Sequence, residues 1–314
     1  MKMFSAVSCA SVAFCALLLG CSSPTNTATL APVRDAAVAP AQYSGLKDLY
    51  VADYDSGTVF LFKNDGYTPD GSITSGISGP WDITLDKSGN LYVANAAGGN
   101  ITEYAPGAST PSFTYSYGMN SPRLVSVDRQ GNVFEADFTD SYGYGKVSEF
   151  PQGSNYPLHS CSVFAPWGVA TDSKGDVFVD YNSSRGFDGH IEEFKGGLAG
   201  CSPTALGVHV DKAAGLALDR HNNILIADFS EGRIDVIPPP YSTVARYLKT
   251  GRRGPLFIAI DRTNTKVFAS VSGFYHSYVF VYNYANDKFL HRLGYGRGRF
   301  ASPYGVVDAP NAVP

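Results

Sequence analysis

Residue types that carry out catalysis are present in this 314-residue sequence, but their spacing forms no catalytic motif. No histidine pair has the HxxxH spacing that places two zinc ligands on one helix face. The Gly-x-Ser-x-Gly turn that presents a nucleophilic serine is also absent from the sequence. We therefore expect the six histidines to be loop or surface residues: His159, His190, His209, His221, His276 and His291.

Acidic and amide residues recur at the ends of short apolar segments. They are Asp53, Asn95, Asp137 and Asp228, with Asp180 one place earlier in its segment. As a functional set they would form a ring of ligands near one face of the fold. As a structural set they would cap the loop that follows, through Asx-type hydrogen bonds, and we expect this second role. The stretch DYDSG, residues 53–57, is too short for a calcium loop.

A repeat positions these residues. A Pro or Ala is followed six residues later by Asp in five places: Pro80 to Asp86, Pro122 to Asp128, Pro166 to Asp172, Ala213 to Asp219, and Pro255 to Asp261. Each Asp precedes a polar turn and then an apolar segment such as LYVAN or ILIAD. A repeat of this length is typical of four-stranded propeller blades.

The alternation of apolar and polar residues indicates strands with one face in an inter-blade core. Each Asp is expected to accept backbone hydrogen bonds in its turn, where Gly or Asn supplies a positive φ. Residues 302–310 copy only the first strand of a unit, whereas the N-terminal unit lacks one. Their pairing would close the ring and remove exposed edges. The prediction is an all-β, six-bladed propeller of four-stranded antiparallel blades over residues 45–314.

The units resemble NHL-type repeats, and the best copy is Pro166-Trp167-Gly168-Val169-Ala170-Thr171-Asp172 followed by VFVDY. The resemblance covers nearly the whole chain after residue 45, without the Asn-His-Leu tripeptide that names the repeat. It implies the propeller fold and leaves the function open.

Lactonases and gluconolactonases have a similar fold and hold a divalent metal in the axial channel through Glu, Asn and Asp. Here the residues that follow the aligned Pro or Ala are Trp81, Arg123, Trp167, Ala214, Leu256 and Tyr304. None of these side chains is a ligand that Ca²⁺ prefers. We therefore predict no catalytic residues, no metal site and no cofactor.

Strand direction places four of these residues at one mouth of the axial channel: Trp81, Arg123, Trp167 and Tyr304. Aromatic rings and an Arg around a concave mouth suit a small ligand or a peptide. The alternative is that the same side chains plug the mouth as packing.

Charge is unevenly distributed along the chain. Residues 241–300 contain ten Lys or Arg and two Asp, a local charge of +8 in a chain whose net charge is −4. Outer-strand and loop positions of two consecutive blades hold Arg246, Lys249, Arg252, Arg253, Arg292, Arg297 and Arg299. This basic patch would bind an anionic lipid or glycan, or it is a solvated edge. The net charge argues against nucleic acid as a partner.

The first 21 residues have one early Lys2 and an apolar run from Phe4 to Gly20 that is short for a membrane span. This pattern is typical of a secretory signal peptide, with a retained anchor helix as the alternative. The run ends in Leu18-Leu19-Gly20-Cys21, which resembles a bacterial lipobox and implies cleavage before Cys21 and lipidation of its thiol. Residues 22–44 are rich in Ser, Thr, Ala and Pro and are predicted to be a flexible tether.

Cys161 and Cys201 occupy corresponding places, in the segments that lead into consecutive blades. A disulfide between them fits an exported protein, and two free thiols are the alternative.

Together these features predict an exported lipoprotein, anchored at the outer membrane or cell surface. Its propeller would act as a monomeric binding or scaffold module for an envelope protein, glycan or small ligand. The alternative is a propeller hydrolase or lyase of the lactonase type.

Overall fold

A computed structural model describes residues 49–63, 68–138, 143–183, 188–251, 254–271, 277–294 and 300–308. The chain divides into two compact units, residues 1–40 and 41–314, and all of the described residues belong to the second unit. The predicted signal peptide, Cys21 and the tether therefore lie outside the described residues. Within the described part, no helix is long and apolar enough to cross a membrane.

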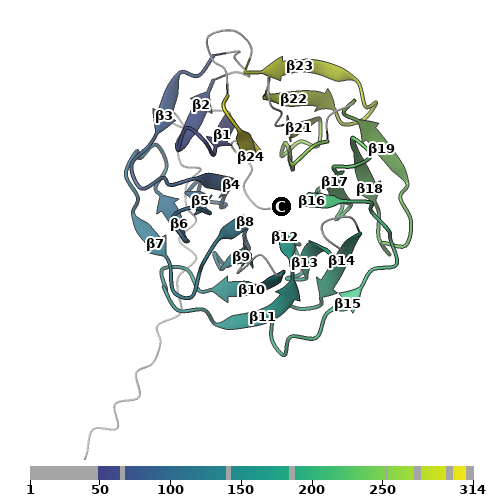
Figure 1. Ribbon diagram of the computed structural model, residues 1–314, viewed down its shortest axis with the longest axis horizontal. Helices are drawn as coiled ribbons and strands as arrows, with labels where there is room; N and C mark the ends of the chain where they lie inside the picture. Colours follow the sequence, from purple (N-terminus) through teal and green to yellow (C-terminus); the bar gives the residue numbers. More distant parts are fainter. Residues whose placement is uncertain are drawn as a thin grey trace, which may run out of the picture. The chain divides into compact units, whose positions relative to one another are not determined.

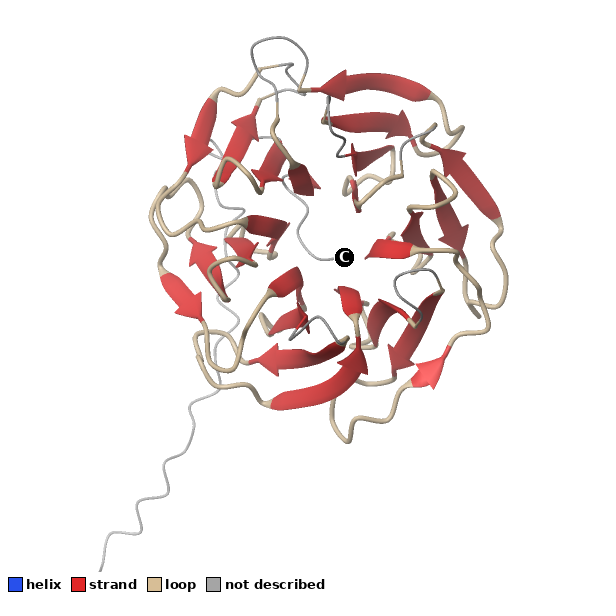
Figure 2. Ribbon diagram, viewed as in Figure 1, coloured by secondary structure: helices blue, strands red, loops and turns tan. Residues whose placement is uncertain are grey.

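Six four-stranded antiparallel sheets surround a central axis as the blades of a propeller (Figures 1 and 2). Blade 1 contains β24 (Pro303–Asp308), β1 (Leu49–Asp53), β2 (Thr58–Phe62) and β3 (Gly71–Ile73). Blade 2 contains β4 (Pro80–Leu85), β5 (Leu91–Asn95), β6 (Asn100–Tyr104) and β7 (Phe113–Tyr115). Blade 3 contains β8 (Pro122–Val127), β9 (Val133–Phe138), β10 (Tyr144–Phe150) and β11 (His159–Phe164).

Blades 4 to 6 repeat this order, with the innermost strand first. Blade 4 contains β12 (Pro166–Thr171), β13 (Val177–Asn182), β14 (Gly189–Phe194) and β15 (Thr204–Ala205). Blade 5 contains β16 (Ala213–Leu218), β17 (Ile224–Asp228), β18 (Arg233–Ile237) and β19 (Arg246–Lys249). Blade 6 contains β20 (Phe257–Ile260), β21 (Lys266–Val271), β22 (Tyr278–Asn283) and β23 (Phe289–Leu293). The predicted all-β, six-bladed architecture is confirmed.

The core lies between adjacent blades, because each sheet buries both of its faces. Between blades 2 and 3, for example, the buried side chains of Tyr92 and Ala94 join those of Val125 and Val133 in one cluster. Alternation along each strand sends one set of side chains to the preceding blade and the other set to the following blade. Burial on both faces explains why the second strands are almost wholly apolar.

The C-terminal strand closes the ring, as predicted. β24 pairs antiparallel with β1, with Leu49 opposite Asp308 and Tyr50 opposite Val307. All of the described strands and this closure lie within residues 41–314. We therefore expect this unit to fold without the first 40 residues.

The turn that follows each innermost strand is built on its aspartate, as predicted. Asp86, for example, accepts hydrogen bonds from the backbone N–H groups of Ser88 and Asn90 and from the Asn90 side chain. Equivalent bonds are accepted by Asp128, Asp172, Asp219 and Asp261. The turn residue with a positive φ is Gly in three of these turns and Asn in the other two.

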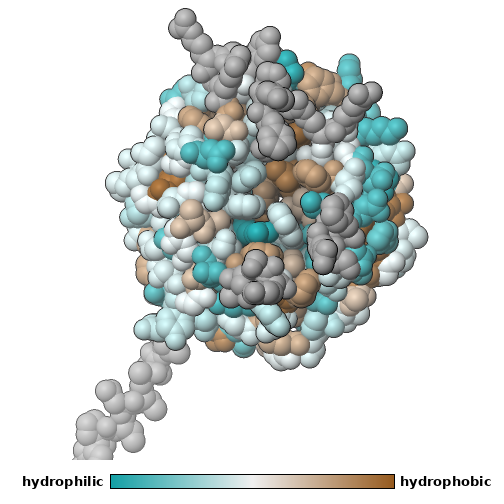
Figure 3. Space-filling model, in the orientation of Figure 1, coloured by the Kyte–Doolittle hydropathy of each residue, from teal (hydrophilic) through white to brown (hydrophobic). Residues whose placement is uncertain are grey.

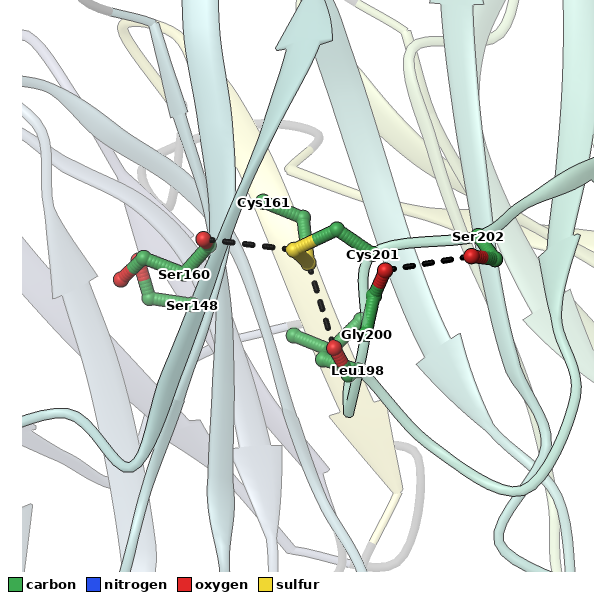
Figure 4. Close-up of a disulfide and its surroundings, with 7 residues drawn as sticks. All are labelled: Ser148, Ser160, Cys161, Leu198, Gly200, Cys201 and Ser202. Atoms are coloured by element: carbon green, nitrogen blue, oxygen red, sulfur yellow. Dashed lines mark hydrogen bonds between the residues drawn. A yellow bond between two sulfur atoms is a disulfide. The ribbon is translucent and has the colours of Figure 1, made fainter.

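Cys161 and Cys201 are joined by a disulfide, with their Cα atoms 5.3 Å apart (Figure 4). Cys161 lies on β11, the outermost strand of blade 3, and Cys201 lies in the loop after β14 of blade 4. The bond therefore ties two neighbouring blades together at their outer edge. It closes a loop with a sequence separation of 40 residues.

Replacing both cysteines, as Cys161→Ser with Cys201→Ser, is expected to lower the free energy of unfolding by about 2–4 kcal/mol. The physical reason is that the open loop restores conformational freedom to the unfolded chain. Chemical denaturation of residues 41–314 measures the effect, with and without a reductant. The reductant should lower the stability of the wild type and leave that of the double variant unchanged, and equal stability of the two proteins without reductant would contradict the prediction.

Candidate functional site

A β-bulge places one extra residue in the innermost strand of five blades. In blade 2 the pairing passes from Pro80 opposite Asn95 to Asp82 opposite Ala94, so Trp81 is the extra residue. Blades 3 and 4 have the same irregularity at Arg123 and Trp167. Blades 5 and 1 also carry an extra residue here. A bulge re-aims the side chain that it carries. The sequence indicated which residues these are, but it did not reveal the bulge.

The four predicted mouth residues, with Tyr54, form a cluster that we call the aromatic cap. The ring centroids of Trp81 and Tyr304 are 4.7 Å apart, and those of Trp81 and Trp167 are 6.4 Å apart. Tyr54 completes the cap with its ring 5.3 Å from that of Trp81. All five side chains are half-buried. In Figure 3, viewed along the axis, hydrophilic and hydrophobic residues both lie around the centre of the propeller. The cap is thus a packed cluster and also a partly exposed surface.

Arg123 is held in the cap by aromatic faces. Its guanidinium carbon lies 4.1 Å from the ring centroid of Trp167 and 3.9 Å from that of Phe138. Burial lowers the pKa of Arg123 to about 10, although the Tyr304 hydroxyl and Asp137 oppose this shift. The Nε and Nη1 atoms of Arg123 and the Nε1 atom of Trp81 are buried without a hydrogen-bond partner among the described residues. Three unpaired donors therefore meet at this end of the axis.

The aspartates and the asparagine at the ends of the second strands hold backbone in place, but only two of them cap the following loop as predicted. Asp137 accepts hydrogen bonds from the N–H groups of Asn120 and Ser121, which lead into β8. Asp53, Asn95 and Asp228 do the same for Ser302, Ser78 and Asp211. Asp53 and Asp228 also cap the following loop, through Ser56 and Glu231. The main contact is thus with the segment before the innermost strand.

Two acidic side chains differ from this pattern and are fully buried. Asp180 and Glu135 are each 0% exposed, and none of their carboxyl oxygens has a hydrogen-bond partner among the described residues. Burial raises the pKa of Asp180 to about 7, and burial together with the charge of Asp137 raises that of Glu135 to about 8. Asp180 was grouped with the acidic and amide residues at the ends of the second strands. Its carboxyl group instead lies over Gly168 of the adjacent strand. Glu135 was not among the residues singled out from the sequence. The only sign of its unusual environment was an acidic residue within an otherwise apolar strand.

A cavity of about 230 Å³ occupies the axis below the aromatic cap. It is lined by the innermost strands and by residues of the turns after β16 and β20, including Arg220, Arg262 and Asn264. It therefore opens at the end of the axis opposite the aromatic cap. Asp82 lines it, and burial raises the pKa of this carboxyl to about 7, against a hydrogen bond from the Val125 N–H. The described residues that line the cavity include no histidine that could pair with Asp82.

The predicted basic patch is only partly described, because Arg252, Arg253, Arg297 and Arg299 lie outside the described residues. Arg246 pairs with Asp287, and its Nη2 donates to the backbone oxygen of Tyr284 at 2.7 Å. Arg246 thus links blade 5 to blade 6. Lys249 is exposed on β19, and Arg292 of β23 lies with its guanidinium 4.6 Å from the Tyr278 ring centroid.

Two histidines meet acidic residues at the edge of blade 4. His190 Nε2 lies 3.1 Å from Asp188 Oδ2, and His209 Nδ1 lies 3.7 Å from Asp188 Oδ1. Ser183 donates to the same carboxylate and holds the pKa of Asp188 below its usual value. The serine and the aspartate both approach Nε2 of His190, which is not the arrangement of a catalytic triad. Among the described residues, no group of His, Cys, Asp or Glu could hold a metal ion.

Comparison with solved structures finds the same fold at low sequence identity. A crystal structure of a nidogen/laminin complex matches 84% of this chain and 98% of that chain, with 14% identity and a TM-score of 0.66. A protein of unknown function from Bacteroides caccae matches over 82% of this chain and 97% of its own, with 9% identity and a TM-score of 0.64. No family model and no curated protein sequence matches this chain. The comparisons therefore support the six-bladed propeller fold, and the NHL-repeat family stays a prediction.

Asp180→Asn is expected to reduce the loss of stability that the protein shows as the pH rises. The folded protein keeps the Asp180 and Glu135 protons up to about pH 7 and 8, whereas the unfolded chain loses them near the ordinary values of 3.8 and 4.5. The free energy of unfolding therefore falls between these limits, and the shift of about three pH units at Asp180 contributes on the order of 4 kcal/mol to the fall.

Denaturation of the variant between pH 4 and pH 8 measures this slope. Asp180→Ala provides a second variant, since four other blades carry Ala at this position, as at Ala94 and Ala136. Glu231→Gln removes an exposed acid and is expected to keep the wild-type slope. An unchanged slope in both Asp180 variants would contradict the assignment.

Proposed function

We propose that this chain is an exported, lipid-anchored binding module with divergent NHL-type repeats. Its aromatic cap would bind an acidic sugar of a cell-envelope glycan. The observation that carries the proposal is the set of three buried donors on Arg123 and Trp81 that have no hydrogen-bond partner in the described part of the chain.

Buried guanidinium nitrogens without an acceptor, such as Nε and Nη1 of Arg123, are costly, because they have lost water and gained no hydrogen bond in return. Stacking on Trp167 and Phe138 offsets only part of this cost. The nearest candidate anion, Asp137, already accepts hydrogen bonds from the N–H groups of Asn120 and Ser121. A carboxylate from a ligand would supply both charge and acceptors, and Arg binds carboxylates in a forked geometry.

The surrounding rings favour a sugar as the bearer of that carboxylate. Trp81, Trp167 and Tyr304 present half-buried aromatic faces around Arg123. Aromatic faces pack against apolar groups while polar groups at their edges remain hydrogen-bonded. A uronic acid combines an apolar ring face with a carboxylate and several hydroxyl acceptors, and it fits both features of the cap.

The nidogen structure is of a complex with laminin, so at least one propeller of this shape is known in a protein complex. That likeness supports a binding role for the fold and does not indicate the ligand of this chain. Export and lipid anchoring are supported by the sequence of residues 1–21.

Cys21→Ser is expected to abolish lipid labelling of the protein in the cells that express it, because the acyl chains would be attached to this thiol. Metabolic labelling with radioactive palmitate followed by immunoprecipitation measures the attached lipid. Ser22→Ala is the matched control and should remain labelled. Equal labelling of Cys21→Ser and of the wild type would contradict lipidation at Cys21, and no labelling of the wild type would favour an anchor helix.

Arg123→Met is expected to weaken the binding of glucuronate to residues 41–314 by roughly ten- to a hundredfold, the value of a charged hydrogen bond. Trp81→Phe keeps an aromatic ring and removes the N–H, and should weaken binding by about two- to tenfold. Isothermal titration measures both, with glucose as the uncharged ligand that should bind worse than glucuronate.

Lys195→Met removes an exposed cation outside the aromatic cap and should leave the affinity unchanged. Equal affinity for glucuronate in the wild type and in Arg123→Met would contradict the proposal. Binding of a glutamate-rich peptide in place of glucuronate, with the same dependence on Arg123, would overturn the sugar assignment and retain the site.

A further inference from the structure

The wall of the axial cavity is mostly apolar, although Asp82, Thr84 and Ser126 also line it. Innermost strands of five blades contribute Val125, Val169, Leu216, Ile258 and Val306 to its lining, and Leu124 and Phe257 lie at its inner end beneath the aromatic cap. Phe257 also packs against the Trp81 ring, with centroids 6.3 Å apart, so it separates the cavity from the aromatic cap. A hollow with mostly apolar walls and one open end suits the apolar part of a ligand.

Donors surround the open end of this cavity. Arg220 and Arg262 occupy the same place in the turns of blades 5 and 6, directly after the turn aspartate, and both line the cavity. Both are exposed, and within the described part of the chain their guanidinium groups have no ion-pair or hydrogen-bond partner. Asn264 lies beside them: its Oδ1 accepts a hydrogen bond from the Arg220 N–H, while its buried Nδ2 has no described partner.

The same turn position is basic in the other blades too. Lys87 and Arg129 follow their turn aspartates directly, and Lys174 follows Asp172 by two residues. All three side chains are exposed. Five turns thus place a cation at this end of the propeller, although only Arg220 and Arg262 line the cavity.

The neighbouring acids do not neutralise these donors by direct pairing. Asp219 accepts hydrogen bonds from the N–H groups of His221 and Asn223 and from the Tyr284 hydroxyl. Asp261 accepts bonds from the N–H groups of Thr265 and Lys266. Both carboxylates therefore face their own turns, and the guanidinium groups remain available to a ligand.

We infer that the axial cavity binds an amphiphilic organic anion. The apolar tail of the ligand lies along the axis, and its carboxylate or other anionic head contacts Arg220, Arg262 and the Asn264 amide at the open end. This site is at the opposite end of the axis from the aromatic cap and does not depend on the function proposed for it.

Octanoate is the probe for this site, and residues 41–314 are the protein. Three ligands separate the parts of the inference: octyltrimethylammonium has the tail with a cation, octyl glucoside has the tail without charge, and acetate has the charge without the tail. Isothermal titration below micellar concentrations should show octanoate binding at least tenfold more tightly than each of them. Equal affinity for octanoate and octyltrimethylammonium would overturn the role of the arginines.

Arg220→Gln with Arg262→Gln is expected to weaken octanoate binding by at least tenfold and to leave octyl glucoside binding unchanged. Ala217→Leu adds volume to the half-buried cavity wall without changing charge, and should weaken all of the ligands with an octyl tail.

Lys174→Gln is the matched control, because it removes an exposed cation from an equivalent turn that does not line the cavity. It should change the octanoate affinity less than twofold. Octanoate binding that survives both the double arginine variant and Ala217→Leu would place the ligand elsewhere and overturn the inference. Thermal unfolding of each variant without ligand separates a loss of binding from a loss of folding.

Discussion

Six innermost strands converge on one axis, and in each blade the second residue after the Pro or Ala of the repeat limits how closely other strands can pack against it. At Gly305 a Cβ atom would lie 2.5 Å from the Cα of Asp82, and at Gly168 it would lie 2.0 Å from Asp180 Oδ1. The equivalent residues of blades 2, 3 and 6 are Asp82, Leu124 and Phe257, which extend into the axis and line the cavity. This mixture of glycine and larger side chains accompanies a cavity at one end of the axis and the aromatic cap at the other. The two candidate binding sites both lie on the axis where this packing constraint acts.

The buried carboxyl groups of Asp82 and Asp180 show two ways of fitting an acidic side chain between packed strands near the axis. In blade 2 the carboxyl group is on the innermost strand, at Asp82, opposite Ala94 of the second strand. In blade 4 it is on the second strand, at Asp180, and the innermost strand has Gly168 opposite it. Asp82 receives a hydrogen bond from the next blade, but Asp180 has no described partner. A small residue thus accompanies each acid, and the unpaired carboxyl group of Asp180 lowers the stability of the protein at neutral pH.

The sequence predicted the features that depend on residues near one another in the chain. The six-residue spacing from Pro80 to Asp86 recurs because the aspartate binds its own turn, and the missing strand at each end predicted the ring closure. The meeting of Trp81, Arg123, Trp167 and Tyr304 was also predicted, because strand direction follows from the repeat, whereas the place of Tyr54 in the aromatic cap was not. The bulges, the stacking of Arg123 between Trp167 and Phe138, and the pairing of Arg246 with Asp287 were not predicted. These contacts join side chains from different strands or blades, and no spacing within one repeat records which rotamers meet.

The net charge of −4 gives little indication of the local charge at the two ends of the axis. Eight aspartates are buried in turns or at strand ends: Asp53, Asp86, Asp128, Asp137, Asp172, Asp219, Asp228 and Asp261. Backbone N–H groups of the same fold satisfy their carboxylates, so these charges are used to hold the turns and the innermost strands. The cations have no such internal role at the axis, since Arg123 lies in the aromatic cap and Arg220 and Arg262 stand at the cavity mouth. A chain that is acidic in sum therefore offers donors at both ends of its axis, and this arrangement favours anionic ligands over cationic ones.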